Sequence, residues 1–469
     1  MIVDLLKVTR AGNRIRLING SGRFFIFKVG LLIMSFTCDI SFKEKTNIFS
    51  YEYLKCILFV VEIDDDDYIF TKKLYSKLIT TSHILEDFLD FHGAKKNKEW
   101  VFYRELSATI RHLALACYSQ RHILNRFKFY NFEENRYETF KLEAFDTLKI
   151  LQESIKFAGP VIIEEARRLK INIPENGYDL SYFPGISSTQ QLDHNIDDFN
   201  AKDHQRENLT RIASEFLEVV KEFDQLAFYE RYDLKKIDKL VPEQINEVII
   251  RRYEMLIHNI QSSFDSYVVN TKSSSENNML EQLRSHFSIV FHLLQVAGRL
   301  LHFYERHMYD IGFKYVYKNV SVSLSDIIDP DVLLDRSVNF CLFYAWKFLS
   351  SGKAIAVIIL NENMKTSIIE VGIPMDRGFH SRPSLLVAKI VQHYGGEVKM
   401  LVNNDIFDAA SVLDIQWAGG KIKKEEVETV QFKGDLRALS DLKILADVNY
   451  GEDHMGKGIP LPKELSYLS

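Results

Sequence analysis

Residues 373–396 read IPMDRGFHSRPSLLVAKIVQHYGG, and this stretch decides the fold of the C-terminal part of the chain. A strand-like run ends here, Gly378 allows a tight turn, and a helix is predicted from about Ser381. Pro383 suits the first helical turn, where its missing N–H loses no hydrogen bond. Apolar residues then recur with helical spacing until Gly395-Gly396 ends the helix.

His380 directly precedes this predicted helix. Backbone N–H groups and the positive end of the helix dipole converge at such a position, which makes it a site for an anion. A phosphoryl group on an imidazole nitrogen of His380 would be held there, and the Arg382 guanidinium would bind its oxygens. The sequence therefore predicts His380 as phosphoacceptor and Arg382 as the stabilising charge. The supporting residues are Gly378, Ser381, Pro383 and Arg377.

This segment resembles the histidine-containing phosphocarrier protein (HPr) of the bacterial sugar phosphotransferase system. The active site of that family reads Gly-Leu-His-x-Arg-Pro, and residues 378–383 here are Gly-Phe-His-Ser-Arg-Pro. Gram-positive members carry a regulatory serine 31 residues after the histidine, and Ser411 stands at that distance from His380. Arg377 departs from the family, which usually has asparagine there, and its charge could bind phosphate directly.

The resemblance implies an α+β domain over residues 366–450, an open-faced β-sandwich with the element order βαββαβα. Its strands are expected at Thr366–Ile373, Glu397–Val402 and about Val427–Phe432, with a turn at Asn403–Asp405. A short second helix would end at Gly419-Gly420, and a last helix would cover Asp435–Ala446.

The resemblance further implies a phosphocarrier-like protein of the phosphoenolpyruvate-dependent system, a phosphohistidine carrier rather than a stand-alone enzyme. Its partners would be an enzyme I-like donor, a downstream phosphoacceptor or regulated protein, and a serine kinase acting on Ser411. A role in regulation is at least as strong an expectation as sugar transport. Two alternatives stay open: a degenerate HPr-like domain that only docks a partner in a scaffold protein, and an enzyme whose catalytic site lies in the helical part. His380 and Ser411 would then simply cap their helices.

The remainder of the chain is predicted to be mainly helical, bundle-like and without an internal repeat. We expect a helical domain over residues 34–350 that can be subdivided near 174–203, and a connecting strand over 351–365 that includes the β-branched run Ala354–Leu360. Residues 451–469 are expected to form a C-terminal tail.

Residues 1–33 are interpreted as an extension or a mis-assigned start, with the true start at Met34. A strand or helix of the fold, or a targeting segment, are the other interpretations of the apolar run Phe24–Phe36. Lys28 interrupts this run, which is shorter than the ~20 residues of a membrane-spanning helix, so no clear membrane segment is predicted.

The composition argues against several classes of protein. The net charge of −5 gives no electrostatic reason to expect a nucleic-acid partner. The four cysteines are far apart, which favours buried free thiols and a cytoplasmic location over disulfides or a zinc knuckle. No cofactor and no metal are expected. The histidines of the segment Leu280–Tyr309 are six, ten and five residues apart, spacings that do not align on one face of an α-helix. They are His286, His292, His302 and His307.

Overall fold

The computed structural model shows a mostly helical protein with a small four-stranded antiparallel sheet near the C-terminus. It describes residues 7–11, 14–18 and 24–26, and then residues 40–468 with gaps at 63–69, 131, 133–136, 186–204, 269–274, 310–314, 376 and 454. The run of four aspartates Asp64–Asp67, for which the sequence favours a solvated turn, and most of the subdivision expected near 174–203 lie outside these residues.

Near the N-terminus, three short strands pair antiparallel in the order β1-β2-β3. They are β1 (Lys7–Ala11), β2 (Arg14–Ile18) and β3 (Phe24–Ile26). The start of the apolar run Phe24–Phe36 is therefore a strand, while residues 27–36 lie outside the described part of the chain.

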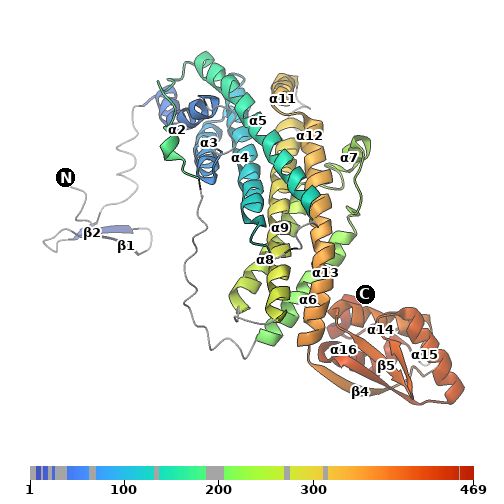
Figure 1. Cartoon of the computed structure of the whole chain (residues 1–469). Coiled ribbons are helices and arrows are strands. Elements are labelled where there is room, and N and C mark those ends of the chain that lie inside the picture. The colour runs from blue at the N-terminus through green and yellow to red at the C-terminus, as the bar shows by residue number, and fades with distance from the viewer. Residues whose placement is uncertain are drawn as a thin grey trace.

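Long amphipathic helices build the helical bundle, with α4 and α9 side by side at its centre (Figure 1). The first group comprises α2 (Phe42–Glu62), α3 (Lys72–Phe91), α4 (Val101–Phe127) and α5 (Glu138–Arg168). The second comprises α6 (Gln205–Asp224), α7 (Leu234–Leu240), α8 (Glu247–Tyr267), α9 (Ser275–Phe303), α11 (Tyr315–Ile327), α12 (Pro330–Asp335) and α13 (Phe343–Asn363). Short 3₁₀ turns lie at Ala94–Lys96 and Leu180–Tyr182. One continuous apolar core joins both groups, so the helical region folds as one body.

Two helices of the bundle contain a π-helical stretch. Helix α9 continues as the π-turn Tyr304–Tyr309, and α12 passes through the π-turn Arg336–Leu342 into α13. A π-helix has i→i+5 hydrogen bonds, so residues five apart come onto one face. Such stretches are frequent at functional sites.

The prediction of a connecting strand at 351–365 is wrong. Residues Ala354–Leu360 belong to α13, which ends only at Asn363. The segment Pro330–Asn363 is, by length and composition, the one candidate membrane span among the described residues, and half of its most apolar window is buried. Within Ala354–Leu360, Ile359 is buried in the core of the bundle and Ile355 packs against it, while Ile358 is 45% exposed, so local β-propensity yields to the packing of one helix face.

The C-terminal unit follows α13 after two residues. Its sheet has the order β4-β7-β5-β6 with every neighbouring pair antiparallel. Alternate residues of the inner strands are buried, among them Val398, Met400 and Phe432, and they form one core with the three helices. The elements in chain order are β4 (Thr366–Gly372), α14 (Ser381–Tyr394), β5 (Val398–Val402), β6 (Asp405–Asp408), α15 (Val412–Glu425), β7 (Thr429–Asp435) and α16 (Leu436–Asp447).

Two further predictions about this unit need correction. The second helix does not end at Gly419-Gly420 but continues to Glu425, and Gly419 lies against the backbone of Phe379, where a Cβ would come within 3.1 Å of the carbonyl oxygen. Residues 451–469 are not a loose tail, because Leu465 and Leu468 are buried in the core of the unit. The C-terminal segment, residues 449–468, contains the 3₁₀ turns Asn449–Gly451 and Lys463–Leu468.

Candidate functional site

His380 is the N-cap residue of α14, in extended conformation with φ −81° and ψ −169°. Its carbonyl accepts the hydrogen bond from the N–H of Ser384, while its side chain makes no capping bond. The imidazole is therefore not used to cap the helix, as an N-terminal Ser or Asp would be. It remains 30% exposed at the end of the helix where anions are favoured.

Gly378 has a φ of +62°, in the left-handed region, and a Cβ there would meet no atom within 4 Å. The glycine is thus favoured by the conformation of the turn rather than by crowding. The turn is also stabilised by the Ser384 hydroxyl, which donates to the carbonyl of Phe379 at 3.0 Å. Phe379 itself is buried, so the turn holds His380 at a fixed place.

Glu452 contacts the imidazole from the C-terminal segment. Its Oε2 lies 3.0 Å from Nε2 of His380, and its side chain is only 3% exposed. With a proton on Nε2 donated to this carboxylate, Nδ1 carries the lone pair. Nδ1 is therefore the nitrogen that this contact leaves without a proton. Sequence reasoning missed this residue, which stands 72 positions from His380 and outside the motif.

Tyr450 anchors the segment that carries Glu452. Its ring packs edge-on against Phe379 with centroids 5.1 Å apart, and its hydroxyl donates to the carbonyl of Gly372 at 2.7 Å. Burial raises the pKa of Tyr450, which keeps this hydroxyl a donor. Gly372 at the end of β4 and Phe379, the residue before His380, therefore both contact Tyr450.

The predicted supporting residues lie around this end of α14. The guanidinium of Arg382 lies over Gly458, where a Cβ would come within 2.0 Å of Nη1, and no ion pair to Arg382 occurs among the described residues. Gln416 of α15 donates to the Ser381 hydroxyl at 3.4 Å. Pro383 is buried in the first turn of α14, and Arg377 is exposed in the preceding turn. The structure therefore brings Arg382 and Ser381 to the helix end that His380 caps.

Ser411 is the N-cap residue of α15, and its hydroxyl accepts the N–H of Asp414 at 3.3 Å. The same hydroxyl lies 3.2 Å from Oδ1 of Asp414. Ser411 therefore caps the N-terminus of α15 in the structure. A phosphoryl group at Ser411 would be stabilised by the N-terminus of α15 and repelled by the Asp414 carboxylate.

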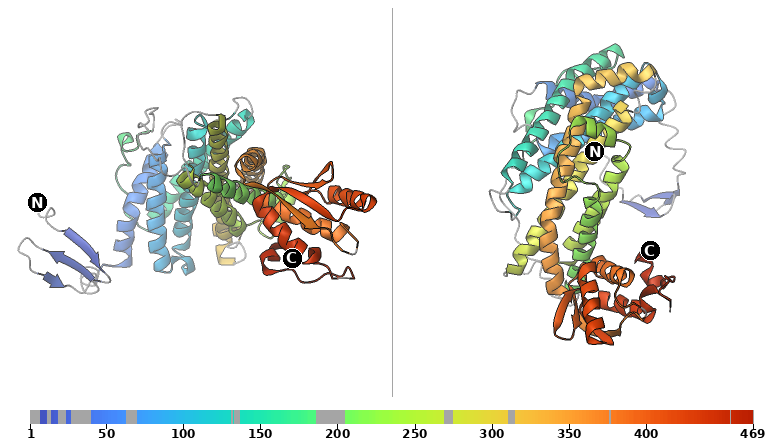
Figure 2. Two further views of the ribbon diagram at one scale, coloured as in Figure 1. Left: turned by 90° about the horizontal axis from the view of Figure 1, so that it is seen from below. Right: turned by 90° about the vertical axis from the view of Figure 1, so that its right-hand side faces the viewer.

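The helical bundle contacts the opposite end of α14. Ser214 of α6 donates to the carbonyl of Tyr394, and His393 lies 3.4 Å from Glu218 of α6. Because α14 has 14 residues, this contact is about 20 Å from His380. Figures 1 and 2 show the C-terminal unit at one end of the bundle. The bundle therefore leaves His380 open, and the cover over it comes from the C-terminal segment.

A second cluster of ionisable side chains lies inside the bundle. One ring nitrogen each of His112, His302 and His307 lies within 4.8 Å of those of the other two. The prediction that the histidines of Leu280–Tyr309 cannot share a face is therefore wrong for His302 and His307. The π-turn aligns them, and the third histidine comes from another helix, α4.

The three cysteines that the structure describes, Cys56, Cys117 and Cys341, are buried free thiols, as predicted. Burial raises the pKa of Cys56 to about 12, which keeps its thiol protonated and unreactive at neutral pH.

Comparisons of the chain with protein-family models, with curated proteins and with solved structures find no match. The function of the C-terminal site therefore has to be argued from its own geometry and from the motif around His380.

Proposed function

We propose that the C-terminal unit is a phosphoryl-carrier domain of the HPr kind and that His380 is its phosphoacceptor. The observation that carries the proposal is an imidazole at the N-terminus of a 14-residue helix, oriented by a buried carboxylate and accompanied by Arg382. The order of the elements from β4 to α16 and the sheet order β4-β7-β5-β6 agree with an open-faced β-sandwich. We further propose that the whole chain is a carrier in the phosphoenolpyruvate-dependent phosphotransferase system of the bacterial cytoplasm.

The chemistry follows from the contacts. Glu452 accepts the Nε2–H of His380, so that Nδ1 attacks the phosphorus atom of a phosphorylated donor and the donor leaves with the electron pair of the broken bond. The backbone N–H groups of the first turn and the Arg382 guanidinium then hold the phosphoryl oxygens by non-covalent contacts. Because these contacts are reversible, the group can pass on to a further acceptor.

Exposed apolar side chains offer a docking surface for the donor and the downstream acceptor. Leu413 and Trp417 of α15 are 62% and 68% exposed, and Met375 before the turn is 73% exposed. Gln416 places this face of the unit next to the start of α14. We assign this surface to an enzyme I-like donor, with regulation through the fused bundle as the role of the whole chain.

The test is incubation of the full chain with bacterial enzyme I and phosphoenolpyruvate labelled in the phosphoryl group. We expect a label on the protein that is labile in acid and stable in alkali, and that is lost in His380→Ala. His393→Ala, at the other end of the same helix, is the matched control and should keep the label. A label that persists in His380→Ala would contradict the assignment.

The alternative is a docking module that transfers no phosphoryl group. The partial cover of His380 by the segment carrying Glu452 favours it, because a partner must fit beside this segment. No label on the wild-type chain, together with binding of enzyme I that is weakened by Trp417→Ala, would support this alternative over transfer.

A further inference from the structure

The centre of the helical bundle contains a buried cluster of three imidazoles from two chain segments. His112 comes from α4, His302 from the last turn of α9 and His307 from the π-turn. The rings of His112 and His302 are stacked with centroids 4.4 Å apart, and those of His302 and His307 are 5.6 Å apart. His112 is 2% exposed and His307 3% exposed. Three imidazoles seldom gather in a protein interior without a partner that binds their lone pairs.

Buried carboxylates orient two of these rings. Nδ1 of His302 lies 2.5 Å from Oε2 of Glu247, and Nδ1 of His307 lies 2.6 Å from Oε2 of Glu105. Both carboxylate side chains are less than a tenth exposed. A carboxylate on Nδ1 fixes the tautomer and directs Nε2 outward, the usual arrangement behind a metal-binding histidine.

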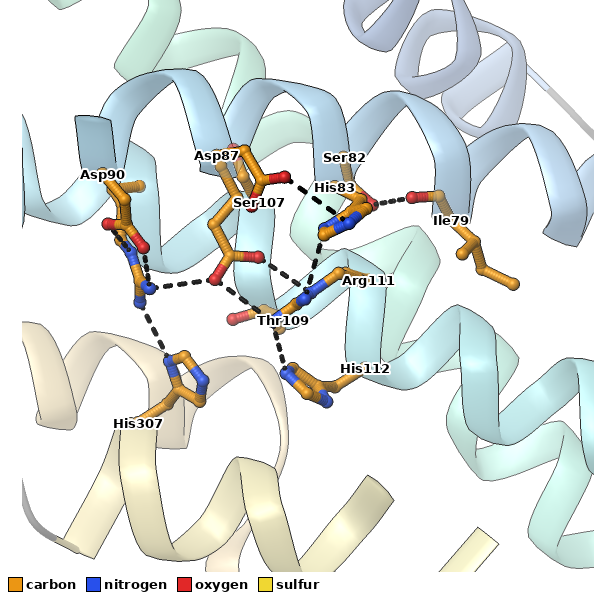
Figure 3. A network of polar contacts seen from close by, with 12 residues as sticks. Ile79, Ser82, His83, Asp87, Asp90, Ser107, Thr109, Arg111, His112 and His307 are labelled. Atoms are coloured by element: carbon orange, nitrogen blue, oxygen red, sulfur yellow. Dashed lines mark hydrogen bonds and ion pairs between the residues drawn. The ribbon is translucent and has the colours of Figure 1, made fainter. Parts of the chain in front are cut away.

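The third ring contains an unsatisfied nitrogen. Nε2 of His112 lies 3.1 Å from Nη2 of Arg111, whereas Nδ1 is buried and has no hydrogen-bond partner. Figure 3 shows His112 next to Arg111 and His307 at the Asp90 end of the polar network, where Nδ1 of His307 also lies 3.4 Å from Nη1 of Arg104. The nitrogens left for a ligand are thus Nδ1 of His112 and Nε2 of His302 and His307.

A metal ion requires neutral imidazoles, and the surroundings of His112 and His302 favour this form. Burial lowers the pKa of His302 to about 4, and burial together with the neighbouring charges holds the pKa of His112 well below its usual range. Burial alone would raise the pKa of Glu105, but the hydrogen bond and charge of His307 and the charge of Arg104 lower it overall. Protons therefore do not compete for His112 and His302 at neutral pH.

Both acidic and basic side chains surround the three imidazoles, and their balance bears on the binding of a divalent cation. Arg104 and Arg111 are both bound by Glu86, at 2.9 Å and 2.8 Å, and Arg104 also by Asp90 at 2.7 Å. These two cations are thus balanced by two carboxylates, and Arg111 keeps Glu86 if His112 turns toward an ion. Glu247 lies behind His302, whereas Glu105 is shared between His307 and Arg104, whose Nη1 lies 3.0 Å from Oε1 of Glu105. Arg299 adds a positive charge close to His112. Arg251 and Arg306 also reach Glu247, but both are more than half exposed, so water screens them.

We propose that His112, His302 and His307 bind a late first-row divalent cation, in the first place Zn²⁺. Three neutral imidazoles without thiolates are ligands that such ions prefer, and they leave a fourth position for water or another oxygen ligand. Zn–N bonds of about 2.0–2.1 Å place ligand nitrogens roughly 3.3 Å apart, so small ring rotations would complete the site. The ion would connect α4 to the end of α9.

The chain offers a matched control in the same two helices. His122 of α4 and His292 of α9 also face each other, with ring centroids 4.1 Å apart, ten residues from His112 and His302. Their Nδ1 atoms contact Lys72 and Gln295 rather than carboxylates, and no third histidine joins them among the groups found in the described residues. A pair of histidines without this support should not retain an ion.

The experiment measures zinc in the tag-free full chain after dialysis by plasma mass spectrometry, with Co²⁺ substitution as a spectroscopic readout. We expect about one zinc per chain in the wild type and in His122→Gln/His292→Gln, and loss of it in His302→Gln/His307→Gln. Glu247→Gln should weaken zinc binding by about tenfold to a hundredfold. Circular dichroism establishes that each variant is folded.

The site is absent if the wild type retains no zinc and shows no four-coordinate Co²⁺ absorption bands. Equal zinc content in the two double variants would also overturn the proposal, since the ion would then lie elsewhere. Labelling of His380 is independent of either result, so failure of this site and failure of the phosphoryl-carrier function are distinguishable.

Discussion

In the proposed phosphoryl-carrier site, Glu452 is the residue that orients the partly exposed imidazole of His380. Its Oε2 contacts His380, and its Oε1 is buried without a hydrogen-bond partner. Taking a carboxylate out of water at this cost is characteristic of residues kept for function rather than for stability. The site is therefore a pair of residues, His380 and Glu452, and not a histidine alone.

Glu452→Gln should slow phosphorylation of His380 without abolishing it. The amide keeps the shape but can present its NH₂ group to Nε2, which favours the tautomer with the proton on Nδ1. We expect a rate lower by on the order of a hundredfold, measured as the initial rate of labelling by enzyme I. Glu464→Gln, an exposed carboxylate in the same segment, should label at the wild-type rate.

Gly458→Val should act on phosphoryl transfer through Arg382. A side chain at position 458 would occupy the place of the guanidinium, which must then turn away from the site. A charge-assisted hydrogen bond contributes about 1.5–3 kcal/mol, so we expect transfer at least about tenfold slower. Arg382→Ala should give a similar loss, and the double variant little more. Additive losses in the double variant would show that Gly458 acts on something else.

At this scale, the sequence predicts what is local in the chain. Gly378, His380 and Arg382 share one turn, so their spacing alone indicates their proximity. Glu452 approaches from 72 residues away through the packing of Tyr450, which leaves no sequence pattern. His302 and His307 were missed because the spacing was judged by α-helical geometry, while the chain forms a π-turn there.

Among the elements, the C-terminal segment is the one whose packing the site depends on. Its residues Tyr450, Leu465 and Leu468 complete the core beneath α14 and α16. The sequence after α16 has no helical or strand period and was predicted to be a tail. Its structure comes from burial of single apolar side chains between proline and glycine turns, which periodicity cannot detect.

Leu465→Ala should destabilise the C-terminal unit and loosen Glu452 at the same time. The side chain is fully buried, and such truncations cost about 2–5 kcal/mol. Chemical denaturation measures the loss, and labelling below the transition should also slow. Leu413→Ala, which removes a side chain that is 62% exposed, should leave the unfolding midpoint nearly unchanged.

The other elements show where propensity decides and where packing does. The strands β4, β5 and β7 and the helices α14 and α16 lie within a few residues of their predicted ranges, whereas no range was predicted for β6. Residues 354–360 have the composition of a strand but continue α13, because Ile355 and Ile359 lie on the helix face that packs against the bundle. Gly419 and Gly420 suggested a helix end, yet Gly419 serves close packing against Phe379.

For the whole molecule, buried neutral histidines should make the stability of the bundle sensitive to acid. Burial lowers the pKa of His292 to about 4 and that of His122, which also faces Lys72, to about 3. Between pH 6.5 and 4 the unfolded chain binds more protons than the folded one, so stability rises with pH in this window and falls as pH is lowered.

The free energy of unfolding should therefore decrease from pH 7 to pH 5, by roughly 2 kcal/mol for His292 and by less for the more exposed His122. Urea denaturation at a series of pH values, in the presence of a chelator, measures this slope. His292→Gln should flatten it. A slope that is the same in wild type and His292→Gln would show that His292 is protonated in the folded chain.

The connection between bundle and carrier unit has a mechanical consequence. Only Met364 and Lys365 separate the end of α13 from β4, a span of about 7 Å. The contact of α6 with Tyr394 adds a second point of attachment. A carrier domain that moves between distant partner sites needs a long flexible linker, and the two residues between α13 and β4 do not form one. In the proposed transfer, donor and acceptor would therefore have to bind at His380 one after the other, because the bundle and the C-terminal unit are joined at two points.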